Sequence, residues 1–230
     1  MAQNSHPANP LALAVLALLF ERPMHPYEMA ATLKHRHKEA SIKLRYGSLY
    51  TVIELLLARG YIAAKATSRE GKRPERTVYR LTDAGREELL DWMRDLLREP
   101  VKEYPQFEAA LSLMPVLPPD EAIALLRDRL LRLAGQIAQI ETELAAVAAM
   151  DWPALAGTHN LPPALASQRK FPPLFSVEAE FRLALLRAEH AFVVELIRRC
   201  VEDGWGPIDL WRDIQAASAA QHEKSEEGPV

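Results

Sequence analysis

Residues 42 to 85 contain side chains of the types that bind the phosphates of DNA. A polar and aromatic segment comes first, with Lys43, Arg45, Tyr46, Gly47, Ser48, Tyr50 and Thr51. A basic segment follows further along the chain, with Arg69, Lys72, Arg73 and Arg76. Lysine and arginine neutralise phosphate, hydroxyl groups donate hydrogen bonds to phosphate oxygens, and glycine allows close approach of the backbone. These residue types predict noncovalent recognition of a nucleic-acid backbone.

The first of these segments is expected to open a helix that begins near residues 45–48. Apolar residues recur after it at spacings of three and four, namely Leu49, Val52, Ile53 and Leu56. Gly60 is suited to end this helix. A helix N-terminus favours phosphate because its backbone N–H groups and dipole point outward. The same residues can equally be ordinary cap and surface residues, with Tyr50 partly buried, and taken alone the two interpretations carry equal weight.

The second segment is expected to form the turn of a β-hairpin. Residues 61–67 and 77–81 are typical of strands, and Gly71 and Pro74 supply turn chemistry between them. A helix followed by such a hairpin is the order of a winged helix-turn-helix, which places the helix in the major groove and the wing on the flanking backbone. A charged loop is commonly just solvated, and Glu75 weakens the local positive field. Its position after the helix and strand favours the wing.

The residues before and after these elements complete an N-terminal domain over residues 1–98. The apolar run 11–20 predicts a buried first helix with Asn9 as N-cap and Pro10 at the first helical position. Ten apolar residues are too few to span a bilayer, and the flanks do not suit a secretory signal. A second helix is expected to open at Pro26, and a fourth to run from Thr82 to about Arg98.

The C-terminal half carries two heptad patterns. One covers residues 120–149, and the other begins after Ser176, which is expected to cap its helix, and runs to about residue 203. The seams comprise Ile123, Leu126, Leu130, Leu133, Ile137, Ile140, Leu144, Leu183, Leu186, Val193 and Ile197. They can pair as an antiparallel hairpin, and their extent predicts that a second copy of the chain also packs on them, so that residues 120–222 form a dimerisation domain. His190 lies in the second seam, where a hydrogen-bonded core residue or a register-setting polar residue is favoured over a contact with a ligand.

The rest of the C-terminal half is divided by composition. Residues 99–119 are expected to be a linker with a short helix, and the proline-rich residues 150–175 an irregular connection. A short helix is expected around residues 208–217, and residues 223–230 are predicted to be a disordered tail. The predicted fold class is therefore mainly α: a winged helix-turn-helix with a two-stranded wing, followed by an all-α, coiled-coil dimerisation domain.

Charge and composition narrow the function. The net charge of −3 hides an asymmetry, because residues 1–98 carry +5 and the remainder −8, which suggests that only the first part meets phosphate. Cys200 is the single cysteine, which excludes an intramolecular disulfide framework and fits a reducing cytoplasm. No pattern of catalytic residues, metal ligands or cofactor-binding loops is found. We therefore expect no enzyme, metal or cofactor.

These motifs resemble the PadR family of bacterial transcriptional regulators. The resemblance rests on residues 26–28, 46–50, 60–62 and 79–89, and residues 175–182 with the following helix resemble the longer C-terminal domain of the virulence-activator-like subfamily. It implies a homodimeric DNA-binding regulator, usually a repressor. The chain departs from the family's pattern at Glu54, Leu55 and Leu57, where basic or acidic side chains are frequent, and at Pro26, where glycine is frequent.

The predicted function is sequence-specific binding of double-stranded DNA by a cytoplasmic homodimer. Two recognition helices would read the half-sites of an inverted repeat. The family analogy adds release by a small-molecule effector, of a phenolic or drug-like kind, although no residue identifies one. The alternative is a winged-helix protein-interaction module without DNA binding that uses Leu55 and Leu57 as its contact surface.

Overall fold

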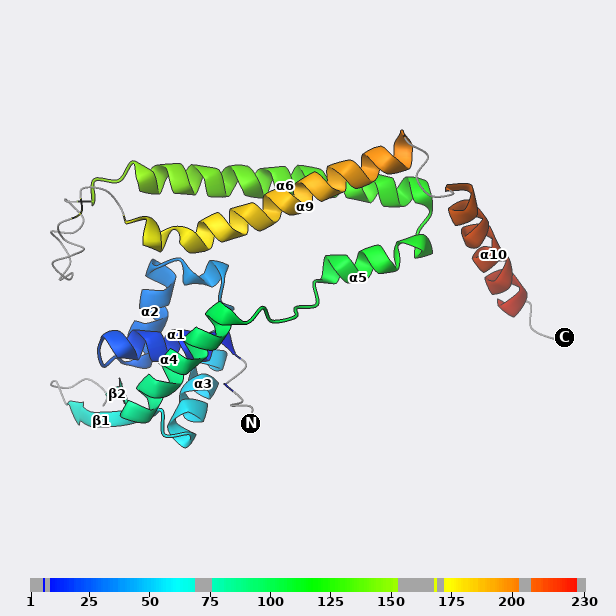
Figure 1. Cartoon of the computed structure of the whole chain (residues 1–230). Coiled ribbons are helices and arrows are strands. Elements are labelled where there is room, and N and C mark those ends of the chain that lie inside the picture. The colour runs from blue at the N-terminus through cyan, green and yellow to red at the C-terminus, as the bar shows by residue number, and fades with distance from the viewer. Residues whose placement is uncertain are drawn as a thin grey trace. The chain divides into compact units, whose positions relative to one another are not determined.

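The computed structural model describes residues 6, 9–68, 76–152, 168, 172–202 and 208–226. The chain divides into two compact units, Met1–Glu103 and Tyr104–Val230. The first unit contains α1 (Pro10–Glu21), α2 (Pro26–His35), α3 (Tyr46–Ala58), β1 (Ile62–Ser68), β2 (Arg76–Leu81) and α4 (Asp83–Arg98), as Figure 1 shows. These are the elements predicted from the sequence, and the winged helix-turn-helix is confirmed.

Helix α1 forms the centre of the first unit because most of its residues are apolar, and its N-terminal end is fixed by a side-chain cap. The Asn9 side chain accepts a hydrogen bond from the Leu11 amide at 3.0 Å, and Pro10 occupies the first helical position. Seven of the twelve residues of α1 are buried. The apolar run is therefore a core helix, as predicted.

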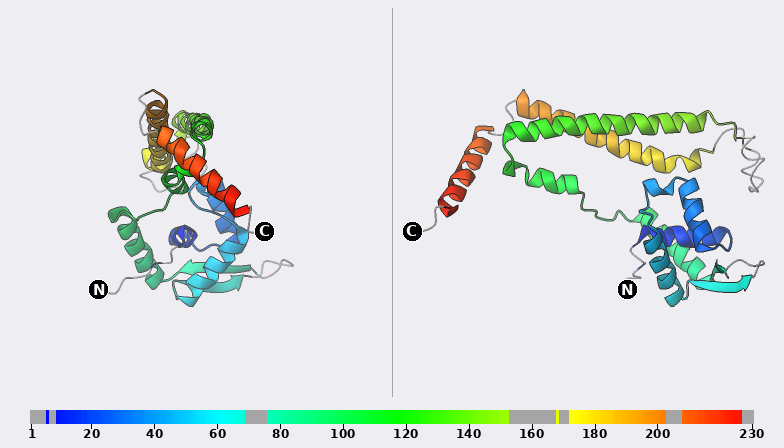
Figure 2. Two further views of the ribbon diagram at one scale, coloured as in Figure 1. Left: turned by 90° about the vertical axis from the view of Figure 1, so that its right-hand side faces the viewer. Right: turned by 180° about the vertical axis from the view of Figure 1, so that it is seen from behind.

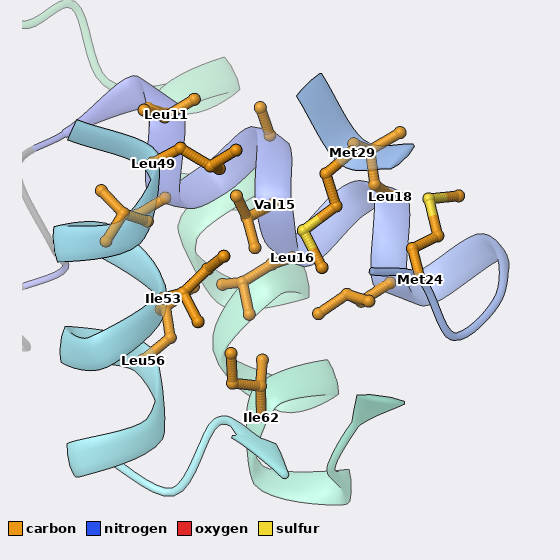
Figure 3. Packing of buried hydrophobic residues seen from close by; sticks show 14 of the residues in the cluster. Leu11, Val15, Leu16, Leu18, Met24, Met29, Leu49, Ile53, Leu56 and Ile62 are labelled. Carbon is orange, nitrogen blue, oxygen red and sulfur yellow. The ribbon is translucent and has the colours of Figure 1, made fainter. Parts of the chain in front are cut away.

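The core of the first unit joins α1 to α2, α3 and the hairpin. Figure 3 shows Val15 and Leu16 of α1 facing Ile53 of α3, with Met29 of α2 and Ile62 of β1 beside them. The predicted apolar positions of α3 are all buried: Leu49, Val52, Ile53 and Leu56. The opposite side of α3 is thereby turned toward solvent.

The hairpin of β1 and β2 is antiparallel, and its register separates a core face from an outer face. Ile62 pairs with Leu81 and Ala64 with Tyr79, and Ile62, Tyr79 and Leu81 pack on the core. Neighbouring positions along a strand point to opposite faces. The intervening pairs, Ala63 with Arg80 and Lys65 with Val78, therefore lie on the outer face.

The chain turns sharply between α3 and β1 at a glycine. Gly60 has φ +71°, a left-handed conformation that glycine adopts without steric cost. Its amide donates to Leu57 O at 2.9 Å, and the Tyr61 amide donates to Leu56 O at 3.0 Å. This pair of bonds is a Schellman motif, which satisfies the last carbonyl groups of α3. Gly60 therefore ends the helix, as predicted.

A second glycine allows α4 to contact this turn. The Thr82 hydroxyl caps α4 by accepting from the Gly85 amide at 3.0 Å, and it lies 2.7 Å from the carbonyl oxygen of Gly60. A Cβ atom at Gly85 would stand 2.0 Å from the carbonyl oxygen of Tyr61. Only glycine fits at position 85 without displacing backbone.

We therefore expect Gly85→Ala to destabilise the first unit. The overpacking should cost about 3 kcal/mol, which corresponds to a fall of roughly 10 °C or more in the melting temperature of a domain of this size. Thermal unfolding followed by circular dichroism measures the change. An unchanged melting temperature would show that α4 can move away from Tyr61 at little cost.

The second unit is helical and is built around a long hairpin. It contains α5 (Gln106–Ser112), α6 (Pro119–Ala148), α9 (Val177–Val201) and α10 (Ile208–Glu226). Helices α6 and α9 run side by side, as the views in Figures 1 and 2 agree, and they are connected in antiparallel fashion. Ion pairs Arg129–Glu189 and Arg187–Glu141, at 2.5 and 2.6 Å, join them. The predicted antiparallel pairing is confirmed.

Three local predictions differ from the structure or lie beyond it. The Ser176 hydroxyl does not cap α9, because it bonds to Pro173 O at 2.8 Å and to the Glu180 carboxylate instead. Helix α10 extends to Glu226, so the chain is still helical after residue 223, where a tail was predicted. Most of the predicted irregular connection, including residues 153–167, lies outside the described residues.

Candidate nucleic-acid interface

The N-terminal end of α3 lacks the side-chain cap that the other α-helices of the first unit possess. Asn9 caps α1, His25 caps α2 through Nδ1, and Thr82 caps α4. Arg45 is the N-cap residue of α3, and its guanidinium has no acceptor atom with which to satisfy the first-turn amides. The first turn of α3 also contains no acidic residue. This helix end is electrostatically suited to an external anion.

The predicted recognition residues of α3 lie at this end and face outward. Lys43, Arg45, Gly47 and Thr51 are exposed, and Ser48 is half-buried. Tyr50 is 51% exposed, so it is a surface residue rather than a partly buried one. A Cβ atom at Gly47 would meet no atom within 4 Å, so the space in front of the first turn is open. The sequence-predicted residues therefore form one surface.

Two residues of the predicted set begin regular elements of the first unit. Tyr46 is the first residue of α3, and Arg76 is the first residue of β2. The remaining wing cations, Arg69, Lys72 and Arg73, lie outside the described residues. Their proposed interaction with DNA stays a prediction.

Two cations that the sequence interpretation omitted lie on the outer face of the hairpin. Lys65 of β1 and Arg80 of β2 are both exposed, and they occupy diagonal positions on the face opposite the core. The signal was present in the alternation of β2, where Tyr79 and Leu81 point inward and Arg80 must point outward. These two residues place positive charge on the outer face of the described part of the hairpin.

The cations of this surface are not neutralised within the part of the chain that is described. Lys43, Arg45, Lys65 and Arg80 form no ion pair among the described residues. Elsewhere in the first unit, Arg22 pairs with Glu28, Arg36 with Glu21 and Arg94 with Asp91. Unpaired cations can neutralise phosphates without first breaking an internal ion pair.

A salt bridge joins the ends of α1 and α2, the two helices that pack with α3 in the core of the first unit. Two guanidinium nitrogens of Arg36, at the end of α2, lie 2.5 and 2.8 Å from the Glu21 carboxylate at the end of α1. These hydrogen bonds hold the pKa of Glu21 below its usual range. A carboxyl group whose pKa is lowered by folding stabilises the folded state at pH values above its unfolded pKa. That contribution is lost as the pH falls through the folded pKa. The helix-turn-helix is therefore braced at neutral pH.

The predicted dimerisation residues lie within the hairpin of a single chain. Six are buried and five half-buried: the buried ones are Ile123, Leu126, Leu133, Ile140, Leu183 and Val193, and the others are Leu130, Ile137, Leu144, Leu186 and Ile197. Leu196 is buried with them, so the seam of α9 shifts by one position near its end. Packing of α6 on α9 already uses this seam. A second copy can also pack on an exposed apolar surface outside this seam.

Helix α9 has such a surface beside its buried seam. Val177, Phe181, Leu185 and Phe192 follow one another at spacings of four, four and seven residues. These spacings place them on one side of the helix, and each is between 45% and 63% exposed. We call these four residues the α9 stripe. Large exposed apolar groups in a row mark an interaction surface.

Metal and membrane sites are not evident. No group of three or more His, Cys, Asp or Glu side chains among the described residues could hold a metal ion. None of the helices described here combines the length and hydrophobicity needed to cross a bilayer. The exposed basic surface of the first unit is therefore the candidate functional site.

Comparison with known proteins identifies the fold and the family. Crystal structures of Bacillus subtilis PadR are similar to the chain. The complex with operator DNA has a TM-score of 0.56 and 20% identity and covers 82% of this chain and 98% of that one. The complex with p-coumaric acid has a TM-score of 0.57 and 19% identity, and it covers 84% of this chain and 97% of that one.

No curated protein matches the chain significantly. Residues 15–91 match the model of the family described as the transcriptional regulator PadR-like family. The winged-helix domain, over residues 15–91, therefore belongs to the PadR-like family of transcriptional regulators.

Proposed function

We propose that the chain is a sequence-specific DNA-binding regulator, acting as a repressor and as a homodimer on an inverted-repeat operator. The observation that carries the proposal is the uncapped N-terminal end of α3, with Gly47 open to solvent and with cations beside it that form no ion pair among the described residues. A helix end of this kind enters the major groove in helix-turn-helix proteins. The operator complex of Bacillus subtilis PadR, which shares the fold, supports the same use of this domain.

The wing would bind the backbone on either side of the groove. Lys65 and Arg80 supply two described cations, and Arg69, Lys72, Arg73 and Arg76 are the predicted ones nearer the tip. Interactions with phosphate position the protein without reading sequence, whereas groups at the end of α3, such as Tyr50 and Ser48, approach base edges. Specificity is therefore assigned to α3 and salt-dependent affinity to the wing.

The homodimer would form through the second unit. The acidic charge of the C-terminal half makes it unsuited to phosphate, and the α9 stripe offers apolar area that a single chain leaves uncovered. Two copies related by a twofold axis would present two α3 helices to two half-sites. A small-molecule effector that releases the operator is part of the proposal, supported by the p-coumaric acid complex of Bacillus subtilis PadR.

A protein-interaction module is the alternative use of the same fold. It would rely on Leu55 and Leu57, but Leu57 packs against the core, and Leu55 is only 37% exposed. The basic surface has no role in that alternative. DNA binding is therefore the better-supported function.

The electrostatic part of the proposal is tested by replacing Lys65 and Arg80 together by alanine. Binding to all duplex sequences should weaken alike, and the slope of log affinity against log salt should fall by roughly one for each phosphate that is no longer neutralised. Fluorescence anisotropy with a labelled duplex over a range of salt measures the slope. Lys72→Ala with Arg73→Ala should act in the same way.

Arg94→Ala is the matched control because Arg94 is a solvent-exposed cation on α4 that already pairs with Asp91 at 2.6 Å. It should leave the slope unchanged. If Lys65→Ala/Arg80→Ala and Arg94→Ala have equal effects, the outer face of the hairpin does not bind DNA.

A further inference from the structure

His6 lies against α4 and contacts three of its side chains. Its ring stacks on Trp92, with the ring centroids 5.7 Å apart and the planes inclined by 6°. Nδ1 lies 2.9 Å from Glu88 Oε1, and Nε2 lies 3.1 Å from Asp95 Oδ2. The imidazole side chain is 14% exposed. A residue that precedes α1 is thereby held on the last helix of the first unit.

The two nitrogen contacts require that both ring nitrogens of His6 carry a proton. A neutral imidazole has one N–H donor and one acceptor nitrogen, whereas an ionised carboxylate only accepts hydrogen bonds. With a carboxylate at each nitrogen, both contacts are hydrogen bonds only when His6 is an imidazolium. Deprotonation would leave a lone pair facing an anionic oxygen, so one of the two contacts would become repulsive.

We propose that His6 is a proton-dependent clasp, whose ring is held on α4 when the imidazole is protonated and is released when the proton dissociates. The clasp is independent of the proposed DNA binding. It is a property of the first unit alone, because every group involved belongs to that unit.

The charged and titratable groups around the clasp favour the protonated form. Glu88 and Asp95 face the ring from α4, and the hydrogen bond that His6 donates to Glu88 is the main cause that raises the pKa of His6, against the opposing effect of burial. Tyr61, between α3 and β1, donates to Glu88 Oε2 at 3.1 Å. Burial raises the pKa of Tyr61, and Arg59 lowers it. Arg98 is 3.8 Å from Asp95 on the outer side.

Glu88 links the clasp to the junction of the recognition helix and the wing. Its two carboxylate oxygens are divided between His6 and Tyr61, and Tyr61 donates one of the two hydrogen bonds that end α3. Release of His6 would free one oxygen of Glu88 while Tyr61 retains the other. The clasp therefore shares Glu88 with Tyr61, the residue at which the chain passes from α3 to β1.

The sign of the pH dependence follows from the raised pKa. A histidine whose pKa is higher in the folded state stabilises that state fully below its unfolded value, about 6.5. The stabilisation is lost as the pH rises through the folded value. The clasp is thus closed in mildly acidic solution and opens toward alkaline pH.

Nuclear magnetic resonance of the full-length protein with isotopically labelled histidine provides the test. His6→Gln identifies the His6 signals by their disappearance. We expect His6 to titrate above about pH 6.5, and Glu88→Gln to lower its pKa toward that value. Asp95→Asn should act in the same direction and leaves the hydrogen bond of Tyr61 intact, so it serves if Glu88→Gln fails to fold. Glu87→Gln, on the adjacent position of α4, should change nothing.

Two titration results would overturn the clasp. One is titration of His6 at or below its ordinary pKa in the unaltered protein, and the other is a pKa that Asp95→Asn and Glu88→Gln leave unchanged. Thermal unfolding supplies an independent check, since His6→Gln should lower the melting temperature more at about pH 6 than at about pH 9. An equal decrease at both values would assign His6 a packing role on Trp92 and contradict the proposal.

Discussion

Replacing Phe181 and Leu185 of the α9 stripe by glutamate is expected to convert the proposed homodimer into monomers. Each side chain would forfeit about 1.5–3 kcal/mol of apolar burial at the interface, and an unpaired carboxylate there adds a further penalty. Together the two replacements weaken association by roughly a hundredfold to ten-thousandfold. Sedimentation velocity over a range of protein concentrations measures the change. Operator affinity should fall with it, because two linked α3 helices bind far more tightly than one.

Exposure of the stripe in the single chain makes the experiment interpretable. Phe181 and Leu185 are 63% and 54% exposed, so glutamate at these positions should leave α6 and α9 folded. Leu131→Glu is the control, because Leu131 is an exposed apolar residue of α6 outside the stripe. Leu133→Asp, in contrast, would place a charge at a buried position and should reduce helical content. A dimer that survives Phe181→Glu/Leu185→Glu uses another surface.

Gly47→Glu is expected to abolish specific DNA binding while the protein remains folded. The position is open, since a Cβ atom there meets nothing within 4 Å, and a glutamate in the first turn of a helix is favoured by the dipole. The melting temperature should therefore stay the same or rise slightly, because glycine is a poor helix former. At the interface, the same carboxylate would face phosphate and occupy the space that the backbone needs. We expect affinity to fall by roughly tenfold to hundredfold at each half-site.

Gly47→Ala and Gly85→Ala separate the effects of shape and folding. Gly47→Ala adds only a methyl group and should weaken binding less than Gly47→Glu. Gly85→Ala should lower stability, because its Cβ would collide with the Tyr61 carbonyl oxygen. If Gly47→Glu binds an operator as tightly as the unaltered protein does, the N-terminal end of α3 is not at the interface.

The sequence predicts the first unit closely because its signals are local. Asn9, Pro10, Gly60 and Thr82 act on the residues next to them, and the structure confirms each as a helix cap, a first helical residue or a helix end. The core face of α3 follows from spacing alone. Arg80 could have been identified from the alternation of β2. The outward direction of Lys65, in contrast, depends on the pairing of the two strands, which the positions of charged residues along the chain do not reveal.

The second unit shows the limit of a periodic pattern. The heptads predict that α6 and α9 have apolar seams, but not whether each seam packs on the other helix or on another chain. In the structure, Leu126 and Val193 belong to one buried cluster of a single chain, and the α9 stripe lies outside the predicted seam. His6 was not predicted at all, since its partners Glu88 and Asp95 are more than eighty residues away.

DNA binding by the first unit, through the end of α3 and the wing, is tested most directly with a random-sequence duplex. The affinity of the full-length protein is measured by fluorescence anisotropy at several salt concentrations. We predict binding at low salt that weakens linearly in a plot of log affinity against log salt, with a slope set by the number of phosphates neutralised. A folded protein that does not bind the duplex at low salt, or whose affinity is independent of salt, would contradict DNA binding and favour the protein-interaction module.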